Sequence, residues 1–420
     1  MSQNGTPDSK ILDAVVIGGG PAGATVSTLV AQKGHRVRLF ERARFPRFHI
    51  GESLIPDTYW VLQRLNMLEK MKKSHFVKKY SVQFANQHGK VSAPFYFSEH
   101  NPHECSQTWQ VVRSEFDQMM LDNAREQGVD VHEGVRVREV LFEGDRAVGV
   151  KVQYEDDRIE DVRARVVIDA SGQSALIGNK FNILKKDADL RKGALWTYWK
   201  GAYRDTGRDE GATLVLQTKG KKGWFWYIPL HDDVVSVGIV RGFDEMFAGN
   251  RDHETIYNEE LDNCPEVKRR VSMGERCDKY YATKDYSYRA TQCAGNGWVL
   301  VGDAYGFLDP LYSSGVLLAL KSGSQAADAV HEALTSNDLT ARTLGVWQQK
   351  YNEGMDRMRR LVVEYYEGFS FGLFVKKHPE YKGHLTDLLI GNLFNNYVGE
   401  VFPLIDKLKE ETAAMSSTTA

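Results

Sequence analysis

Three glycines near the N-terminus have the spacing of a phosphate-binding turn. Gly18, Gly20 and Gly23 follow the apolar run 11–17 directly, and Glu41 stands eighteen positions after the last glycine. Glycines here permit a tight turn and let a pyrophosphate approach the N-terminus of the next helix, where unpaired N–H groups favour anions. The Glu41 carboxylate can accept hydrogen bonds from ribose hydroxyls and argues against a 2′-phosphate. The motif therefore predicts a dinucleotide site.

The elements around these glycines are those that the chemistry needs. Residues 11–17 are typical of a buried strand, small residues at helical spacing continue to about residue 33, and residues 35–41 favour a second strand. This order is a βαβ unit of the expected length, so the sequence predicts a Rossmann-type core.

The glycine motif alone cannot distinguish FAD from NAD. Two later segments of the sequence make this distinction. Gly302, Asp303 and Ala304 follow an apolar run, and Arg113 begins a pattern with helical spacing. Here the sequence resembles the p-hydroxybenzoate hydroxylase-like FAD flavoproteins. The resemblance implies non-covalent FAD, with Asp303 near its ribityl and pyrophosphate groups and Arg113 near the flavin chain.

An aromatic segment narrows the resemblance further. Residues 224–229 read Trp-Phe-Trp-Tyr-Ile-Pro, which resembles the WxWxIP signature of flavin-dependent halogenases. In that family the two tryptophans line the passage between flavin and substrate. A tryptophan-rich core strand is the other interpretation of such a segment, because large aromatic side chains often serve packing.

Three more segments are similar to the phenol- and pyrrole-type halogenases. They are 49–56 (HIGESLIP), 307–315 (FLDPLYSSG) and 76–79 (FVKK), and with them the likeness extends over about residues 11 to 330. The resemblance implies that backbone N–H groups at Ser314 and Gly315 hold a halide. It also implies that a lysine, Lys79 or alternatively Lys78, guides hypohalous acid to the substrate.

One departure concerns the substrate. Tryptophan halogenases carry a glutamate just before the serine of the halide turn, where this chain has Tyr312. The difference disfavours a free indole and favours an electron-rich phenol or pyrrole. The expected site comprises the catalytic Lys79, no metal ligand, and three further groups. The cofactor-binding residues are Gly18, Gly20, Ala22, Gly23, Glu41, Arg42, Ser53, Arg113, Asp303 and Gly315; the halide residues are Ser314 and Gly315; the tunnel or substrate residues are Trp224, Trp226, Ile228, Pro229 and Tyr312.

Composition sets the remaining limits. A formal net charge of −2 gives no general attraction to nucleic acid or to an anionic membrane. The four cysteines form no CxxC pair, which argues against a zinc or dithiol motif and fits a reducing compartment. Residues 1–10 lack an apolar signal-peptide core and no long apolar run occurs, so we expect a cytoplasmic protein without a membrane span.

The expected fold is α/β. A Rossmann-type FAD-binding domain of the glutathione reductase/p-hydroxybenzoate hydroxylase kind would take residues 8–75, 107–185 and 285–330. An antiparallel β-sheet substrate domain would take 76–106 and 186–284. A helical C-terminal segment (331–412) and a flexible tail (413–420) would complete the chain.

The expected function is halogenation of a phenol or pyrrole, free or carrier-bound, with FADH2, O2 and chloride or bromide. The expected partners are a separate flavin reductase and, for a carrier-bound substrate, an acyl or peptidyl carrier protein. An FAD-dependent monooxygenase and a prenyl or geranylgeranyl-type reductase of the same fold are the alternatives, and a flavin-binding accessory protein without turnover is a third.

Overall fold

The computed structural model describes residues 11–249, 251–284 and 286–418. Its first sheet is built on the predicted βαβ unit, β1 (Leu12–Ile17), α1 (Pro21–Gln32) and β2 (Val37–Glu41). Strand β1 pairs in parallel with β2 and with β10 (Ile159–Asp169). The order across this sheet is β19-β20-β10-β1-β2-β7. The Rossmann-type core is confirmed.

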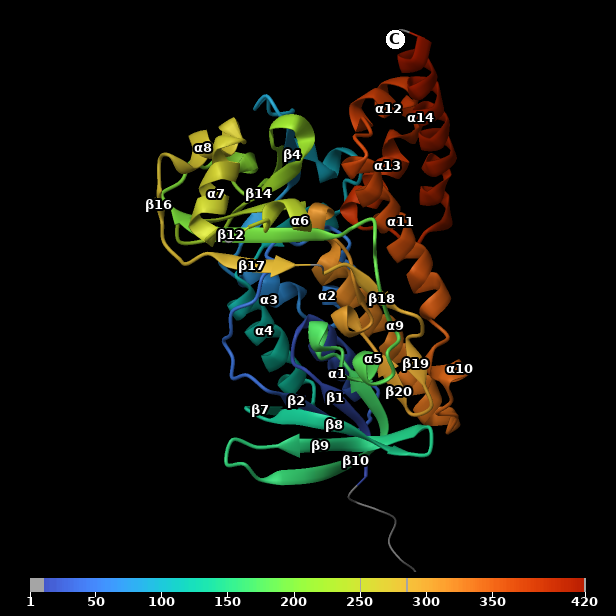
Figure 1. Cartoon of the computed structure of the whole chain (residues 1–420). Coiled ribbons are helices and arrows are strands. Elements are labelled where there is room, and N and C mark those ends of the chain that lie inside the picture. The colour runs from blue at the N-terminus through green and yellow to red at the C-terminus, as the bar shows by residue number, and fades with distance from the viewer. Residues whose placement is uncertain (1–10, 250, 285, 419–420) are drawn as a thin grey trace, which may run out of the picture.

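Helices and a second set of strands complete this half of the molecule. Helix α1 packs against both α4 (Arg113–Glu126) and α9 (Ser314–Ser336). The remaining strands of the first sheet are β7 (Asp130–Glu133), β8 (Arg136–Glu143), β9 (Arg146–Gln153), β19 (Ala294–Gly295) and β20 (Trp298–Leu300). Strands β8 and β9 form an antiparallel meander with β10 at the bottom of Figure 1.

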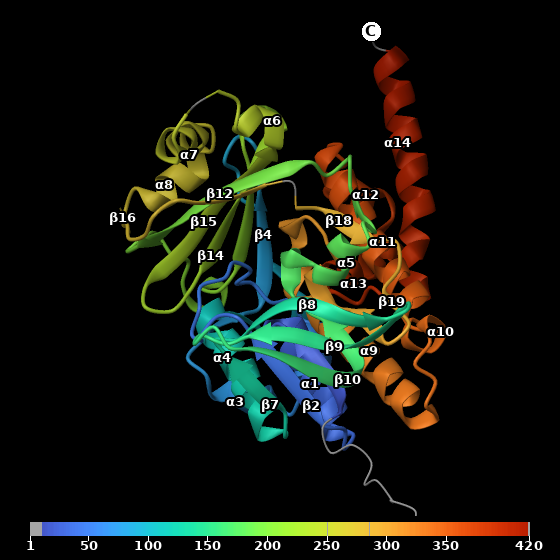
Figure 2. The same ribbon diagram turned by 60° about the horizontal axis from the view of Figure 1, so that its bottom comes forward.

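The second sheet lies opposite the first and has the order β16-β12-β15-β14-β13-β4-β5, with β17 also paired to β12; Figure 2 shows its long strands. It is antiparallel except that β4 runs parallel to β13, which differs from the fully antiparallel sheet expected from the sequence. Its strands are β4 (Ser81–Ala85), β5 (Phe95–Tyr96), β12 (Lys192–Lys200), β13 (Thr213–Gln217), β14 (Gly223–Pro229), β15 (Val234–Gly242), β16 (Glu275–Arg276) and β17 (Tyr281–Lys284).

Period-two alternation divides the side chains of β14 between two cores. Trp224 and Trp226 face the main core, whereas Phe225 and Tyr227 pack in a separate cluster with residues of α7 (His253–Asp262) and α8 (Pro265–Val271). The strand is therefore covered on both faces, which explains why all seven of its residues are buried. The tryptophans are on the face directed toward the first sheet's half of the molecule.

Smaller elements connect the two sheets. Strands β3 (Val77–Lys79) and β6 (Thr108–Gln110) form a two-stranded ribbon, and β11 (Leu184–Lys186), β18 (Tyr288–Ala290) and β21 (Gly306–Phe307) form a three-stranded sheet. The short helices are α2 (Thr58–Arg64), α3 (Leu68–Lys73), α5 (Leu176–Lys180) and α6 (Phe243–Met246).

The C-terminal part is helical, as expected, and stands along one side of the molecule in Figure 1. Its helices are α10 (Ala341–Leu344), α11 (Gln348–Tyr366), α12 (Phe371–Lys377), α13 (Lys382–Ile390) and α14 (Val401–Thr418). Helix α14 continues to Thr418, where the sequence predicted a flexible tail from residue 413; residues 419–420 lie outside the described part. Residues 8–10, where the first domain was expected to begin, also lie outside the described part. The division into two domains, a helical C-terminal segment and a tail stays a proposal.

Among the described residues no helix combines the length and apolar character that crossing a bilayer requires.

Candidate functional site

A cavity of about 860 Å³ is lined by residues of both sheets. Its size lies in the upper part of the roughly 300–1,000 Å³ range of ligand and cofactor sites. The glycine turn after β1 contributes Gly18 and Gly20, and the second sheet contributes Trp224, Trp226 and Ile228. The structure therefore brings the predicted dinucleotide turn and the predicted tunnel strand to one space.

The glycine turn has the shape that a pyrophosphate site needs. Ala22 also lines the cavity, whereas Gly23 lies behind it, where an added Cβ would stand 1.9 Å from the Gly18 carbonyl oxygen. The absence of that carbon lets α1 begin directly under the turn. Glu41 accepts hydrogen bonds from the Gly19 N–H (2.7 Å) and the Ala43 N–H (2.8 Å) and so ties the ends of β1 and β2 together.

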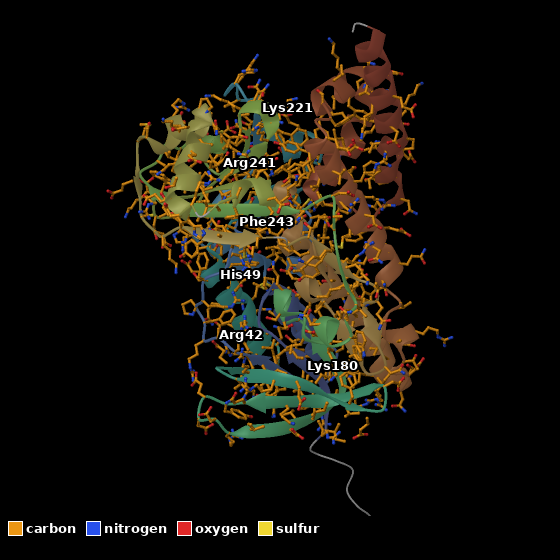
Figure 3. The ribbon with its side chains drawn as sticks, viewed as in Figure 1. Arg42, His49, Lys180, Lys221, Arg241 and Phe243 are labelled. Atoms are coloured by element: carbon orange, nitrogen blue, oxygen red, sulfur yellow. The ribbon has the colours of Figure 1, made fainter. Side chains whose placement is uncertain are left out.

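Arg42 and His49, which are labelled in Figure 3, line the cavity from the segment that follows β2. Arg113 holds this segment in place. Its guanidinium donates to both carboxylate oxygens of Asp117 (2.8 and 2.9 Å) and to the carbonyl of Ile50 (2.7 Å). A Cβ at Gly51, whose φ is +109°, would stand 2.8 Å from the Arg113 Nη1, so this close approach requires glycine.

Asp303 is a half-buried carboxylate that also lines the cavity. Burial raises its pKa to about 6, against the opposing effect of the Arg113 charge. A polar group that is poorly solvated but faces a cavity is well placed to bind ligand hydroxyls.

The indole nitrogens of the two tryptophans make separate hydrogen bonds. Trp224 Nε1 donates to the Tyr366 hydroxyl at 2.8 Å, and Tyr366 donates to Asp309 Oδ2 at 2.9 Å. Trp226 Nε1 donates to the Ser236 hydroxyl at 3.1 Å. Each ring is therefore fixed by a hydrogen-bond partner as well as by packing, as buried indoles usually are.

Glu52 lines the cavity near Ser236, the hydroxyl that accepts the Trp226 hydrogen bond. Tyr198 donates to its Oε1 at 2.7 Å. Burial raises the pKa of Glu52 to about 7, and the hydroxyls of Tyr198 and Ser236 oppose that rise. A carboxyl group with such a pKa can exchange a proton at neutral pH.

Lys79 is buried, whereas Lys78 is exposed. Lys79 Nζ donates to the Ser53 hydroxyl at 2.8 Å and to the Leu54 carbonyl at 3.1 Å. Burial lowers the pKa of Lys79 to about 7. Lys79 does not itself line the cavity; Ser53 does, so the ammonium lies directly behind the wall.

The predicted halide turn is at the N-terminus of α9. Ser313 has a left-handed backbone (φ 58°, ψ 30°) and the helix begins at Ser314, so the N–H groups of its first turn have no partner within the helix. Ser313 and Gly315 line the cavity. The Ser314 hydroxyl is buried and, within the described part of the chain, has no hydrogen-bond partner.

Three of the predicted tunnel and halide residues do not line the cavity: Pro229, Tyr312 and Ser314 lie behind its surface. The sequence also left several participating residues unassigned. Tyr366, Ser236, Tyr198 and Asp309 carry hydrogen bonds of the site. Asp309 lies within the segment 307–315 that the resemblance marked, whereas the local sequence does not mark Ser236 or Tyr198, because their partners come from distant segments.

Comparisons with known proteins show which family this chain resembles. The profile of the tryptophan halogenase family matches residues 13–113 and 87–369. A 1H-pyrrole-2-carbonyl-(peptidyl-carrier protein) brominase from Pseudoalteromonas luteoviolacea is 32% identical over 391 residues, which cover 92% of this chain and 93% of the relative. The corresponding chlorinase from Pseudomonas fluorescens is 28% identical, covering 96% and 94%. The solved structure of the flavin-dependent brominase Bmp2 superposes with a TM-score of 0.86 at 28% identity, covering 96% and 99%.

Proposed function

The chain belongs to the flavin-dependent halogenases, and from this premise we propose that it halogenates a pyrrole or phenol ring with hypohalous acid guided by Lys79. The observation that carries the proposal is the position of Lys79. Its Nζ is buried behind Ser53 on the wall of the cavity that holds the tryptophans. Lys78, the alternative lysine, is exposed to solvent.

The residues around the cavity fit FAD. The glycine turn and Glu41 suit the adenosine and pyrophosphate, while Arg42, Arg113 and Asp303 supply charged and polar groups farther along. Bound reduced FAD, with O2, supplies the oxidation that converts a halide ion and a proton into hypohalous acid and water.

The turn before α9 would hold the halide. Two backbone N–H groups at Ser314 and Gly315 and the unpartnered Ser314 hydroxyl are donors, and a helix N-terminus favours an anion. No charged side chain is needed for such a site.

Lys79 would then orient the oxidised halogen. As an ammonium it can donate to the oxygen of hypohalous acid, in place of one of its present acceptors, Ser53 and Leu54. In the substitution the ring carbon gains the halogen and loses a proton, while the hypohalous oxygen leaves as water.

Glu52 is our candidate for the group that accepts the ring proton. It lies on the cavity wall and is held by Tyr198 of β12, a strand of the second sheet. Its raised pKa, about 7, leaves a substantial carboxylate fraction at neutral pH. Tyr312 occupies the position of the glutamate in tryptophan halogenases, so Glu52 would supply a carboxylate from another segment.

We infer the substrate class and the carrier-protein partner from the names of two related proteins. The brominase and the chlorinase are both named for a pyrrole carried by a peptidyl carrier protein. We therefore propose a carrier-bound pyrrole as the first substrate to test, and a separate flavin reductase as the source of reduced FAD.

The test is product analysis by mass spectrometry with FAD, NADH, a flavin reductase, O2 and bromide. Pyrrolyl-carrier protein, free pyrrole, free phenol and free indole are offered to the wild type, Lys79→Ala and the matched control Lys78→Ala. We expect a bromine isotope doublet that Lys79→Ala loses and Lys78→Ala keeps. Survival of the doublet in Lys79→Ala refutes the role of Lys79. An oxygenated or reduced product formed with NADH alone instead identifies a monooxygenase or reductase.

A further inference from the structure

Two histidines and a glutamate meet at the surface, outside the flavin cavity. His75 lies between α3 and β3, Glu115 is in the first turn of α4, and His231 follows β14. His75 Nε2 is 2.9 Å from Glu115 Oε2, and His231 Nε2 is 3.2 Å from Glu115 Oε1. Sequence spacing could not reveal this cluster because its members come from three separate segments.

The spacing of the three groups suits a tetrahedral metal ion. One ligand atom from each side chain can be chosen so that all lie within 4.8 Å of one another. Zinc bound at about 2.0–2.2 Å to nitrogen and oxygen would keep its ligand atoms about 3.4 Å apart. Each histidine Nε2 lies 2.9 or 3.2 Å from one of the two Glu115 oxygens, so an ion bound here would need the three side chains to move apart or together by about 1 Å.

A second, independent observation concerns the other nitrogen of His231. Its Nδ1 lies 2.9 Å from Asp232 Oδ2, as in the carboxylate–histidine–metal arrangements of bound zinc. When Nδ1–H donates to the Asp232 carboxylate, the neutral ring presents its Nε2 lone pair to the Glu115 carboxylate. That Nε2 is buried and, among the described residues, makes no hydrogen bond. In that tautomer a bound cation would satisfy both the Nε2 lone pair and the carboxylate.

We propose that His75, Glu115 and His231 bind a divalent transition metal of the zinc class, with water as the fourth ligand. Two imidazoles and a carboxylate are the donors that this class prefers. The side chain of His75 is 67% exposed, so the ion can enter from solvent.

The ion would tie together three elements of the halogenase site. His75 precedes the strand that carries Lys79, Glu115 follows Arg113 by two positions, and His231 follows the tryptophan strand. None of the three metal ligands lines the flavin cavity, so the metal would act as a structural clip between the two sheets and not as a reactant.

The test is equilibrium dialysis of the untagged, EDTA-treated full chain against zinc chloride, with metal counted per chain. The variants are His75→Ala, His231→Ala and Asp232→Asn. The matched control is His384→Ala, which removes a histidine 3.8 Å from Glu400, a pair that no third ligand joins among the described residues. We expect one high-affinity zinc in the wild type and the control, and its loss in both ligand variants. We expect affinity about tenfold lower in Asp232→Asn.

The melting temperature gives a readout that does not depend on halogenation. Zinc should raise it in the wild type and in His384→Ala but not in His75→Ala or His231→Ala, because a ligand stabilises only a chain that binds it. Melting of the variants without zinc verifies that they fold. The proposal is overturned if the wild type binds no zinc, or if the double variant His75→Ala/His231→Ala binds as much as the wild type. The first result would indicate that a proton, not a metal, bridges the cluster.

Discussion

The indole nitrogen of Trp224 lies 2.8 Å from the hydroxyl oxygen of Tyr366, although 142 positions separate the two residues in the chain. Tyr366 is the last residue of α11, and its hydroxyl donates onward to Asp309 in the turn before α9. The C-terminal helices thereby link the tryptophan strand to the proposed halide turn.

Replacing Tyr366 with phenylalanine tests this link. The change leaves the buried Asp309 Oδ2 without its donor, so we expect about 1–3 kcal/mol lower free energy of unfolding. Halogenation should also slow, because Trp224 loses its partner. Denaturant unfolding and product formation measure the two effects. The matched control is Tyr365→Phe, since Tyr365 is outside this hydrogen-bond chain; equal losses in both variants would show that the link has no special role.

Lys79→Met should increase stability while it abolishes halogenation. The pKa of Lys79 falls from its ordinary 10.5 to about 7 because burial disfavours the ammonium. Between these values the unfolded chain binds more protons, so the wild type gains stability as pH rises from 7 toward 10.5. The variant lacks this dependence. Its stability advantage should therefore be largest at pH 7 or below and shrink toward pH 10.

Thermal melting of Lys79→Met and the wild type from pH 6 to pH 10 checks whether the stability difference shrinks as pH rises. We expect a melting temperature a few degrees above the wild type at neutral pH. Lys78→Met, at an exposed position, should leave the curve unchanged. An advantage that grows with pH would contradict the buried ammonium.

Much of the framework follows from local sequence. Helix α4 begins at Arg113, as the helical spacing predicted, and the βαβ unit appears where periodicity indicated. The choice between Lys79 and Lys78, in contrast, could not be made from local sequence. In a three-residue strand the side chains alternate, and which one is buried depends on the β6 partner strand and on Ser53. Ser236 and Tyr198 were missed for the same reason, because only tertiary packing brings them to the site.

The pH dependence of turnover should report Glu52. Burial raises the pKa of this carboxyl to about 7, so its base form increases as pH rises through 7. The Lys79 ammonium, whose pKa is also about 7, decreases over the same range. We expect a narrow bell-shaped rate profile centred near neutrality. Glu52→Gln should lower the rate and remove the acidic limb while keeping the alkaline limb. An unchanged acidic limb in Glu52→Gln would assign the base to another group.

Ser314→Ala separates halide binding from the later steps. The Ser314 hydroxyl is buried without a partner in the described part of the chain, at the start of the helix whose N–H groups would hold the ion. A hydrogen bond to an ion contributes about 1.5–3 kcal/mol, so its loss should raise the KM for bromide about tenfold or more. The KM for the aromatic substrate should stay the same, because the variant keeps the backbone N–H groups and the cavity wall. Initial rates at varied bromide and fixed aromatic substrate measure the change. If the KM for bromide stays constant while the chain becomes more stable, the hydroxyl is only an unpaired buried group, and the halide would depend on the backbone N–H groups alone.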